Sequence, residues 1–77
     1  MILTSQFKGK TVYIKQINFK DPHIVHKLDN IGLTPGAKVK VLNFNKDKKL
    51  LYLDIGNVDY VLRERDCHAI EVEEVRS

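Results

Sequence analysis

The sequence has 77 residues, which suits one domain and is close to the lower limit at which an apolar core alone stabilises a fold. Hydrophobic residues make up 43% and charged residues 30%, an ordinary balance for a globular protein, and no apolar run approaches the roughly 18 residues that a membrane helix needs. The net charge of +3 is mild and acidic residues gather near the C-terminus, so the sequence lacks the concentrated basic face of a dedicated nucleic-acid binder.

The compartment is indicated by two features of the sequence. The opening Met1-Ile2-Leu3 is followed directly by polar residues, so this apolar run is too short for a signal peptide. Cys67 is the only cysteine and cannot form an intramolecular disulfide, whereas small secreted domains usually contain several. We therefore expect one domain over residues 1–77, in the cytoplasm and without membrane insertion.

The first predicted elements are a short turn over residues 3–9 and a strand over residues 10–19. The turn carries two apolar side chains one helical turn apart and ends at a glycine. The strand is rich in β-branched and aromatic residues, and its apolar residues change parity near Lys15 and Gln16. This change predicts a bulge, and a bulged strand bends in the way that small barrels require.

A helix is predicted from Asp21-Pro22 to about Asn30. Aspartate accepts hydrogen bonds from the free amides of a first helical turn, and proline is tolerated at the first helical position. A helix of about ten residues is marginal alone in water, so its apolar face must pack on the strands. We assign four residues to this face: Ile24, Val25, Leu28 and Ile31.

The next segment predicts a fixed turn between the helix and a central strand. Gly32 stands where a glycine in the left-handed conformation ends a helix, with Leu33 folding back onto the last turn. Pro35 and Gly36 have the chemistry of a type II turn, because proline presets φ at the second position and glycine supplies φ > 0 at the third. Gly32, Pro35 and Gly36 are thus structural turn residues. Apolar residues then alternate with lysines over residues 37–41, as in a half-buried strand.

The remaining chain predicts two hairpins and a last strand. Its elements are a polar hairpin tip over 45–49, a strand over 51–55, a two-residue connection at 56–57, a strand over 58–62, one helical turn over 63–66 and a strand over 69–73. About five short strands with one short inserted α-helix predict a mainly β fold, a small and partly open SH3-like barrel.

Two segments resemble the FeoA family, the small cytoplasmic components of bacterial ferrous iron uptake, and the related C-terminal domain of some metal-dependent repressors. Residues 28–39 are similar to the family's leucine, glycine-leucine, proline-glycine, valine signature, and residues 60–72 to its leucine-arginine turn and isoleucine-x-valine end strand. The resemblance covers nearly the whole chain. In two departures, Lys27 replaces the usual arginine and so loses two-pronged pairing with a carboxylate, and the tip over 45–50 lacks the common proline.

The resemblance implies a non-enzymatic accessory protein of iron homeostasis, described at family level by transition metal ion binding. It implies binding to, and regulation of, the FeoB-type GTP-dependent iron permease, at its cytoplasmic face or GTP-binding domain. We expect a small apolar and cationic contact surface at the turn and at a neighbouring strand end, formed by Lys27, Leu33, Thr34, Pro35 and Arg63.

The sequence itself predicts neither a metal site nor a catalytic site. The only soft metal ligands are His23, His26, Cys67 and His68, and transition-metal sites need three or more converging donors. An iron-transport role does not require this chain to contact iron. No serine stands near a histidine and no glycine-rich loop has phosphate-binding spacing. We therefore expect no enzyme, no cofactor and no metal.

Two other functions stay open. Small barrels with a Pro-Gly-x-x-Val strand start also occur among nucleic-acid or ribosome-associated modules, although this chain lacks an aromatic pair amid basic residues on which bases stack, so no nucleic acid is expected. The chain also fits a detached version of the repressor domain, which would dock onto a proline-rich segment of another protein. The sequence does not separate this last function from the permease accessory.

Overall fold

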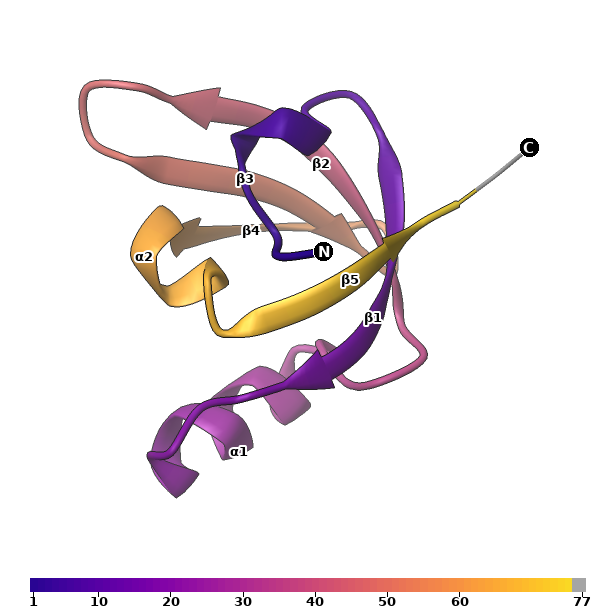
Figure 1. The fold of residues 1–77 in the computed structure, drawn as a ribbon, viewed down its shortest axis with the longest axis vertical. Coiled ribbons are helices and arrows are strands. Elements are labelled where there is room, and N and C mark those ends of the chain that lie inside the picture. Colours follow the sequence, from indigo (N-terminus) through magenta and orange to yellow (C-terminus); the bar gives the residue numbers. More distant parts are fainter. Residues whose placement is uncertain (76–77) are drawn as a thin grey trace.

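An antiparallel sheet in the order β4-β3-β2-β1-β5 curls into the SH3-like barrel that the strand pattern predicts (Figure 1). The structure is a computed structural model, and it describes residues 1–75. The strands are β1 (Thr11–Ile17), β2 (Lys38–Asn45), β3 (Leu50–Ile55), β4 (Val58–Arg63) and β5 (Ile70–Glu74). The helices are the 3₁₀ turn η1 (Ser5–Phe7), α1 (Pro22–Asn30) and the single turn α2 (Glu64–Cys67). The fold is thus mainly β with one inserted helix.

The core fills the space that the curled sheet encloses. Alternate strand residues point into it, which is the period-2 pattern of a sheet with one buried face. The N-terminal turn, α1 and α2 each add one buried side chain, Phe7, Leu28 and Cys67 respectively. The side chains with no exposed area are Leu3, Val12, Leu33, Val39, Val41, Leu51, Leu53, Cys67 and Ile70. This set confirms that the strand alternation, and not helix packing, provides most of the core.

Two bulges bend the sheet. The pairing of β1 with β5 shifts between Ile14 and Gln16, which confirms the predicted bulge at Lys15. A second shift lies between Val41 and Asn43 where β2 pairs with β3, and the sequence pattern did not predict it. Bulges increase local twist and curvature, so together they let a short sheet close toward a barrel.

The predicted ends of α1 are confirmed by its hydrogen bonds. The Asp21 carboxylate accepts from the backbone N–H of His23 at 2.9 Å. At the other end, the Leu33 N–H donates to the Leu28 carbonyl at 2.9 Å and the Gly32 N–H donates to the Asp29 carbonyl at 3.1 Å. These two bonds form a Schellman motif, and Gly32 has the left-handed φ of +85° that this motif needs.

The predicted type II turn is also present, and it is attached to β1. The Ala37 N–H donates to the Thr34 carbonyl at 2.9 Å, and Gly36 has φ of +92°. On the β1 side, the Gly36 N–H donates to the Ile14 carbonyl at 2.7 Å and the Ile14 N–H donates to the Ala37 carbonyl at 2.9 Å. The turn therefore sets the register between β1 and β2.

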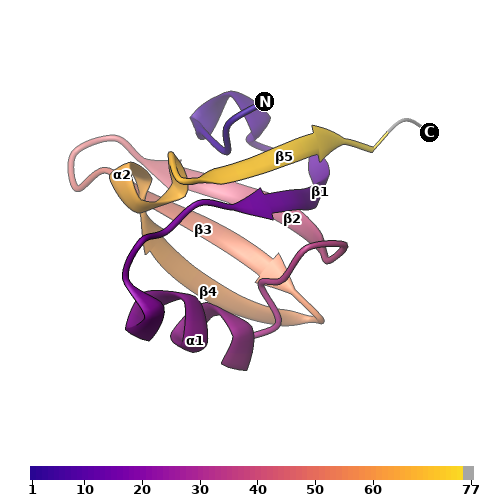
Figure 2. The same cartoon turned by 60° about the horizontal axis from the view of Figure 1, so that its bottom comes forward.

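The face assigned to α1 needs one correction. Leu28 is buried and Ile24 and Ile31 are half-buried, but Val25 is 38% exposed. Ile24, Leu28 and Ile31 follow one stripe at helical spacing, whereas Val25 lies a quarter-turn around the axis. Figure 2 shows α1 at the side of the barrel where β1 and β4 do not pair, and so it meets the core along only one stripe. No helix among residues 1–75 is long and apolar enough to cross a membrane.

Candidate partner-binding groove

A groove of about 660 Å³ lies between the end of β1, the exposed side of α1 and the Thr34-Pro35 turn. We call it the α1 groove. Its apolar lining comes from Ile17, Phe19, Pro22, Val25, Leu33 and Pro35. Its polar and charged lining comes from Lys15, Gln16, Lys20, His26, Asp29 and Thr34. An apolar floor with cationic residues at one side is a surface that suits a protein segment carrying apolar and acidic side chains.

The groove exists because of the local structure of three elements. The bulge at Lys15 turns the end of β1, and the chain then reverses direction into α1. Pro22, Val25, His26 and Asp29 follow helical spacing and form a second stripe of α1, beside the stripe that packs on the core. The Schellman motif and the type II turn then reverse the chain, so that Leu33, Thr34 and Pro35 line the groove next to this stripe.

The predicted contact residues lie in three separate places. Thr34 and Pro35 line the α1 groove at the surface, and Leu33 lines its base with no exposed area. Lys27 is exposed and borders a smaller cavity of about 130 Å³, which α1 shares with Leu62. Leu33 therefore shapes the groove from below.

Arg63 is not brought next to the turn. It pairs with Leu50 at one end of β3, in a hollow of about 420 Å³ that also includes His68. Gly32, at the start of the turn, packs against Ile55 at the opposite end of β3. The turn, Lys27 and Arg63 thus border three different hollows and do not form the single surface that was expected.

Two groove residues were missed by sequence reasoning. Val25 was assigned to the buried face, and Phe19 was treated as a strand residue although β1 ends at Ile17. The spacing of Val25 was ambiguous, because it lies three residues from both Pro22 and Leu28 and therefore borders both stripes of the helix. No local signal identified Phe19, whose position depends on how the chain leaves the sheet.

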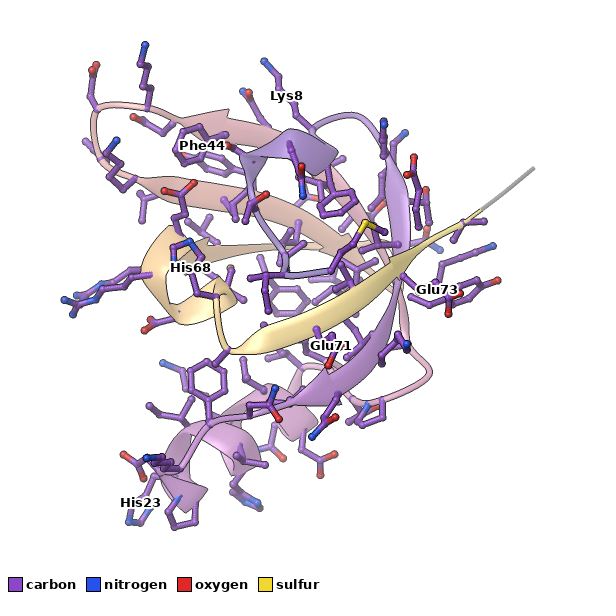
Figure 3. The ribbon with its side chains drawn as sticks, in the orientation of Figure 1. Lys8, His23, Phe44, His68, Glu71 and Glu73 are labelled. Atoms are coloured by element: carbon purple, nitrogen blue, oxygen red, sulfur yellow. The ribbon has the colours of Figure 1, made fainter. Side chains whose placement is uncertain are left out.

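The potential metal ligands and the cysteine do not form a reactive centre in the described part of the chain. His23 lies on α1 and His68 in the turn after α2, well apart in Figure 3. No group of three or more His, Cys, Asp or Glu side chains converges within residues 1–75. Burial, with smaller contributions from the charges of Asp66 and Glu64, raises the pKa of Cys67 from 9.0 to about 12. Its thiol is therefore neutral at physiological pH and a poor nucleophile or metal ligand.

Comparison with known proteins decides the family. The model of the FeoA domain matches residues 1–74. The chain belongs to the FeoA family. FeoA domains are small accessory domains associated with ferrous iron transport, and the match includes the whole of the sheet, α1 and the turn.

Solved structures of FeoA proteins share the fold. The iron(II) transport protein A of Clostridium thermocellum is 28% identical with a TM-score of 0.86, over 97% of this chain and 46% of that chain. The FeoA protein of Chlorobium tepidum is 22% identical with a TM-score of 0.85, over 99% of this chain and 71% of that chain. This chain thus spans less than half the length of the Clostridium protein.

A regulator of transcription shares the fold as well. A manganese-dependent transcriptional repressor is 20% identical with a TM-score of 0.80, over 88% of this chain and 37% of that chain. At this identity the likeness concerns the fold alone. No curated protein sequence matches the chain.

Proposed function

We propose that this FeoA-family protein is a non-enzymatic, cytoplasmic accessory of bacterial ferrous iron uptake. It binds the cytoplasmic GTP-binding domain of the FeoB-type permease through the α1 groove and regulates the permease from there. The observation that carries the proposal is the FeoA match over residues 1–74. The α1 groove, at about 660 Å³, is large enough to hold a segment of a protein partner, which supports binding at this surface.

The chemistry of the groove supports a protein partner. Val25 is 38% exposed and belongs to the apolar floor of the groove. Burial of this side chain against a partner would contribute to association. Lys15 and Lys20 at the β1 side favour an acidic segment and orient it before contact. The Schellman motif and the hydrogen bonds from the turn to β1 hold the groove rigid, so little ordering entropy opposes binding.

A nucleic-acid function has less support. Tyr13 is the one aromatic side chain among residues 1–75 that is exposed by more than a third, at 41%. Its cross-strand neighbour on β5 is Glu73, whose carboxylate repels phosphate. Bases would therefore meet an isolated ring beside an acidic strand, and not the stacking platform of single-strand binders.

The proposal is tested by titrating the GTP-binding domain with groove variants. Val25→Asp places a carboxylate on the apolar floor, and Lys20→Glu reverses a charge at the β1 side; both positions are exposed, so the fold should persist. We expect Val25→Asp to raise the Kd by about tenfold or more, equivalent to about 1.4 kcal/mol. Lys20→Glu should raise it less and make binding less dependent on salt.

Lys48→Glu is the matched control, because it makes the same charge change at the exposed hairpin tip, outside the groove. It should leave the Kd nearly unchanged. Equal weakening by Lys48→Glu and Lys20→Glu would mean that net charge, and not the groove, governs binding. Absence of binding by the wild-type protein, to the domain and to the intact permease, would reject the proposal. Leu33 also lines the groove but is fully buried, so a substitution there would disturb the fold and would not test the groove surface.

A further inference from the structure

A hollow of about 420 Å³ lies where the tip of the β2–β3 hairpin meets the end of β4, and most of the side chains that line it are basic. We call it the cationic hollow. The hairpin contributes Lys48, Lys49 and Leu50. The end of β4, α2 and the turn after it contribute Arg63, Glu64, Arg65 and His68. None of these residues lines the α1 groove, so the cationic hollow is a separate surface.

The fold concentrates the net charge of the chain in this hollow. Its lining has four lysine and arginine side chains against one glutamate, a net charge of +3 with His68 neutral. The whole chain also has a net charge of +3, so its other nine basic residues are balanced by nine acidic ones. The neighbouring carboxylates Asp47 and Asp66 do not line the hollow, and Asp66 borders the smaller cavity beside α1 instead. The basic residues come from two separate segments, so their concentration appears only in the folded chain.

Backbone pairing holds the two segments against each other. The Glu64 N–H donates to the Lys49 carbonyl at 2.9 Å, and Arg63 lies directly opposite Leu50 in the pairing of β3 with β4. Figure 3 shows His68 beside α2, on the side of the hairpin. The frame of the barrel therefore brings these side chains together before any ligand arrives, and little backbone ordering opposes binding.

The four cationic side chains of the hollow have no bound counter-charge in the described part of the chain. The ion pair within residues 1–75 joins Lys10 and Glu74 at 3.1 Å, and neither of them lines the hollow. No side-chain hydrogen bond within these residues is donated by a lysine or an arginine. Like charges gathered in one place repel each other, and a bound anion relieves that repulsion. The donors of the hollow are thus available to an anionic ligand.

The side chains and the shape of the hollow favour a compact oxyanion with several charges. Each arginine presents a planar fork of N–H donors that pairs with two phosphate oxygens at once, and the lysines add compact positive charges. A single phosphate group carries about 1.5–2 negative charges at neutral pH, less than the +3 of the lining, whereas a di- or triphosphate group matches it. The volume of about 420 Å³ falls within the roughly 300–1,000 Å³ of small-molecule sites. A concave site of this size suits a compact ligand better than a flat membrane surface.

We propose that the cationic hollow binds the di- or triphosphate group of a small molecule. Arg63 and Arg65 hold the phosphate oxygens, and the two lysines of the hairpin tip neutralise the charge from the other side. The carboxylate of Glu64 repels the same ligand, so it keeps binding weak and reversible. This site shares no residue with the groove proposed for the permease, so failure of either proposal leaves the other unaffected.

The test is isothermal titration calorimetry of the protein with tripolyphosphate at low ionic strength, where charges are weakly screened. We expect a Kd of roughly 10 μM to 1 mM for the wild-type protein. Arg63→Gln and Lys49→Gln should each raise the Kd about fivefold or more. Arg63→Lys keeps the charge but loses the fork, so it should raise the Kd less than Arg63→Gln does. Glu64→Gln removes the one carboxylate of the lining and should lower the Kd about threefold, a gain that damage to the fold does not produce.

Lys8→Gln is the matched control for Lys49→Gln, because it removes the charge of an exposed lysine outside the hollow (Figure 3). It should leave the Kd nearly unchanged, and circular dichroism of each variant checks the fold. Sulfate is the matched anion, since it is an oxyanion with a single centre, and it should bind about tenfold more weakly than tripolyphosphate. Equal weakening by Lys8→Gln and Lys49→Gln, or equal affinity for sulfate, overturns the proposal, because net charge alone would then govern binding.

Vesicles of phosphatidylglycerol test whether the phosphate belongs to a lipid. Binding to the vesicles without binding to tripolyphosphate overturns the proposal in favour of a membrane surface. Absence of tripolyphosphate binding by the wild-type protein at millimolar concentration overturns it as well. Amide shifts of the ¹⁵N-labelled protein that centre on Lys49 and His68 when tripolyphosphate is added support the hollow as the site, and shifts centred elsewhere reject it.

Discussion

Gly36 shows how a single residue can fix the register between β1 and β2. Its φ of +92° belongs to the left-handed region that side-chain-bearing residues rarely adopt. Nothing lies within 4 Å of a Cβ added there, so a side chain would meet no neighbour and its cost would come from backbone strain alone. Because the Gly36 N–H also donates to Ile14, relief of that strain by movement would disturb the pairing of β1 with β2.

We predict that Gly36→Val lowers the free energy of unfolding by about 1–3 kcal/mol, a large share for a domain of this size. Gly36→Asn should cost less, since asparagine tolerates the left-handed region better. Thermal melts of the three proteins measure this, with Lys48→Val at the exposed tip as a control that should change little. An unchanged melting temperature for Gly36→Val would contradict the type II turn.

The raised pKa of the Cys67 thiol leads us to predict that the stability of the protein depends on pH. Its pKa is about 12 in the folded protein against 9.0 when unburied, so the folded state holds the thiol proton more tightly. The stabilisation from this group is complete below pH 9 and is lost as the pH rises toward 12. Relative to Cys67→Ala, the wild-type protein should therefore lose stability between pH 9 and 11, and urea unfolding at pH 7, 9 and 10.5 measures the difference.

The same burial protects the thiol from reagents. Native Cys67 should react with an aromatic disulfide such as DTNB at pH 8 many times more slowly than the unfolded chain does. Fast reaction of the folded protein, or parallel pH curves for the wild type and Cys67→Ala, would show that the side chain is accessible.

At the scale of elements, the ends of α1 were predictable because they depend on adjacent residues. Asp21 and Pro22 begin the helix and Gly32 ends it by local hydrogen bonding. The residue types at these positions are helix start and stop signals that can be recognised in the sequence. The bulge at Lys15 was visible as a parity change, but the shift between Val41 and Asn43 left no such signal, since Leu42 fits either face. Local chemistry thus determined where elements begin and end.

The composition of the groove was less predictable, because it depends on how elements are oriented to one another. Val25 is exposed since α1 meets the core along a single stripe, and that orientation follows from the path between β1 and α1. Arg63 and Gly32 lie at different ends of β3 for the same reason, although both belong to segments that the sequence singled out. Long-range register decides such neighbours.

The cap of α1 gives a prediction at this scale. Asp21→Ala removes the acceptor for the His23 N–H and should lower the free energy of unfolding by about 1 kcal/mol. Asp21→Asn keeps an acceptor oxygen and should cost only a few tenths of that energy. Urea denaturation of the three proteins provides the measurement, and equal losses for alanine and asparagine would assign the effect to charge instead of to the cap.

For the whole molecule, the barrel separates two surface hollows. The α1 groove is lined from β1, α1 and the turn, while the cationic hollow of about 420 Å³ includes Arg63 and His68, and the two share no lining residue. The sequence predicted the barrel, because strand alternation and turn chemistry define it, but not which residues each surface hollow brings together.

The most direct measurement is an NMR titration of the ¹⁵N-labelled protein with the GTP-binding domain of the FeoB-type permease. Binding in the α1 groove predicts that the largest amide shifts fall on Gln16, Lys20, Val25 and Thr34, while the exposed tip at Lys48 stays unchanged. Val25→Asp should abolish these shifts at the same concentrations. A spectrum that does not change, or shifts centred on the hairpin tip, would contradict the groove as the partner-binding surface.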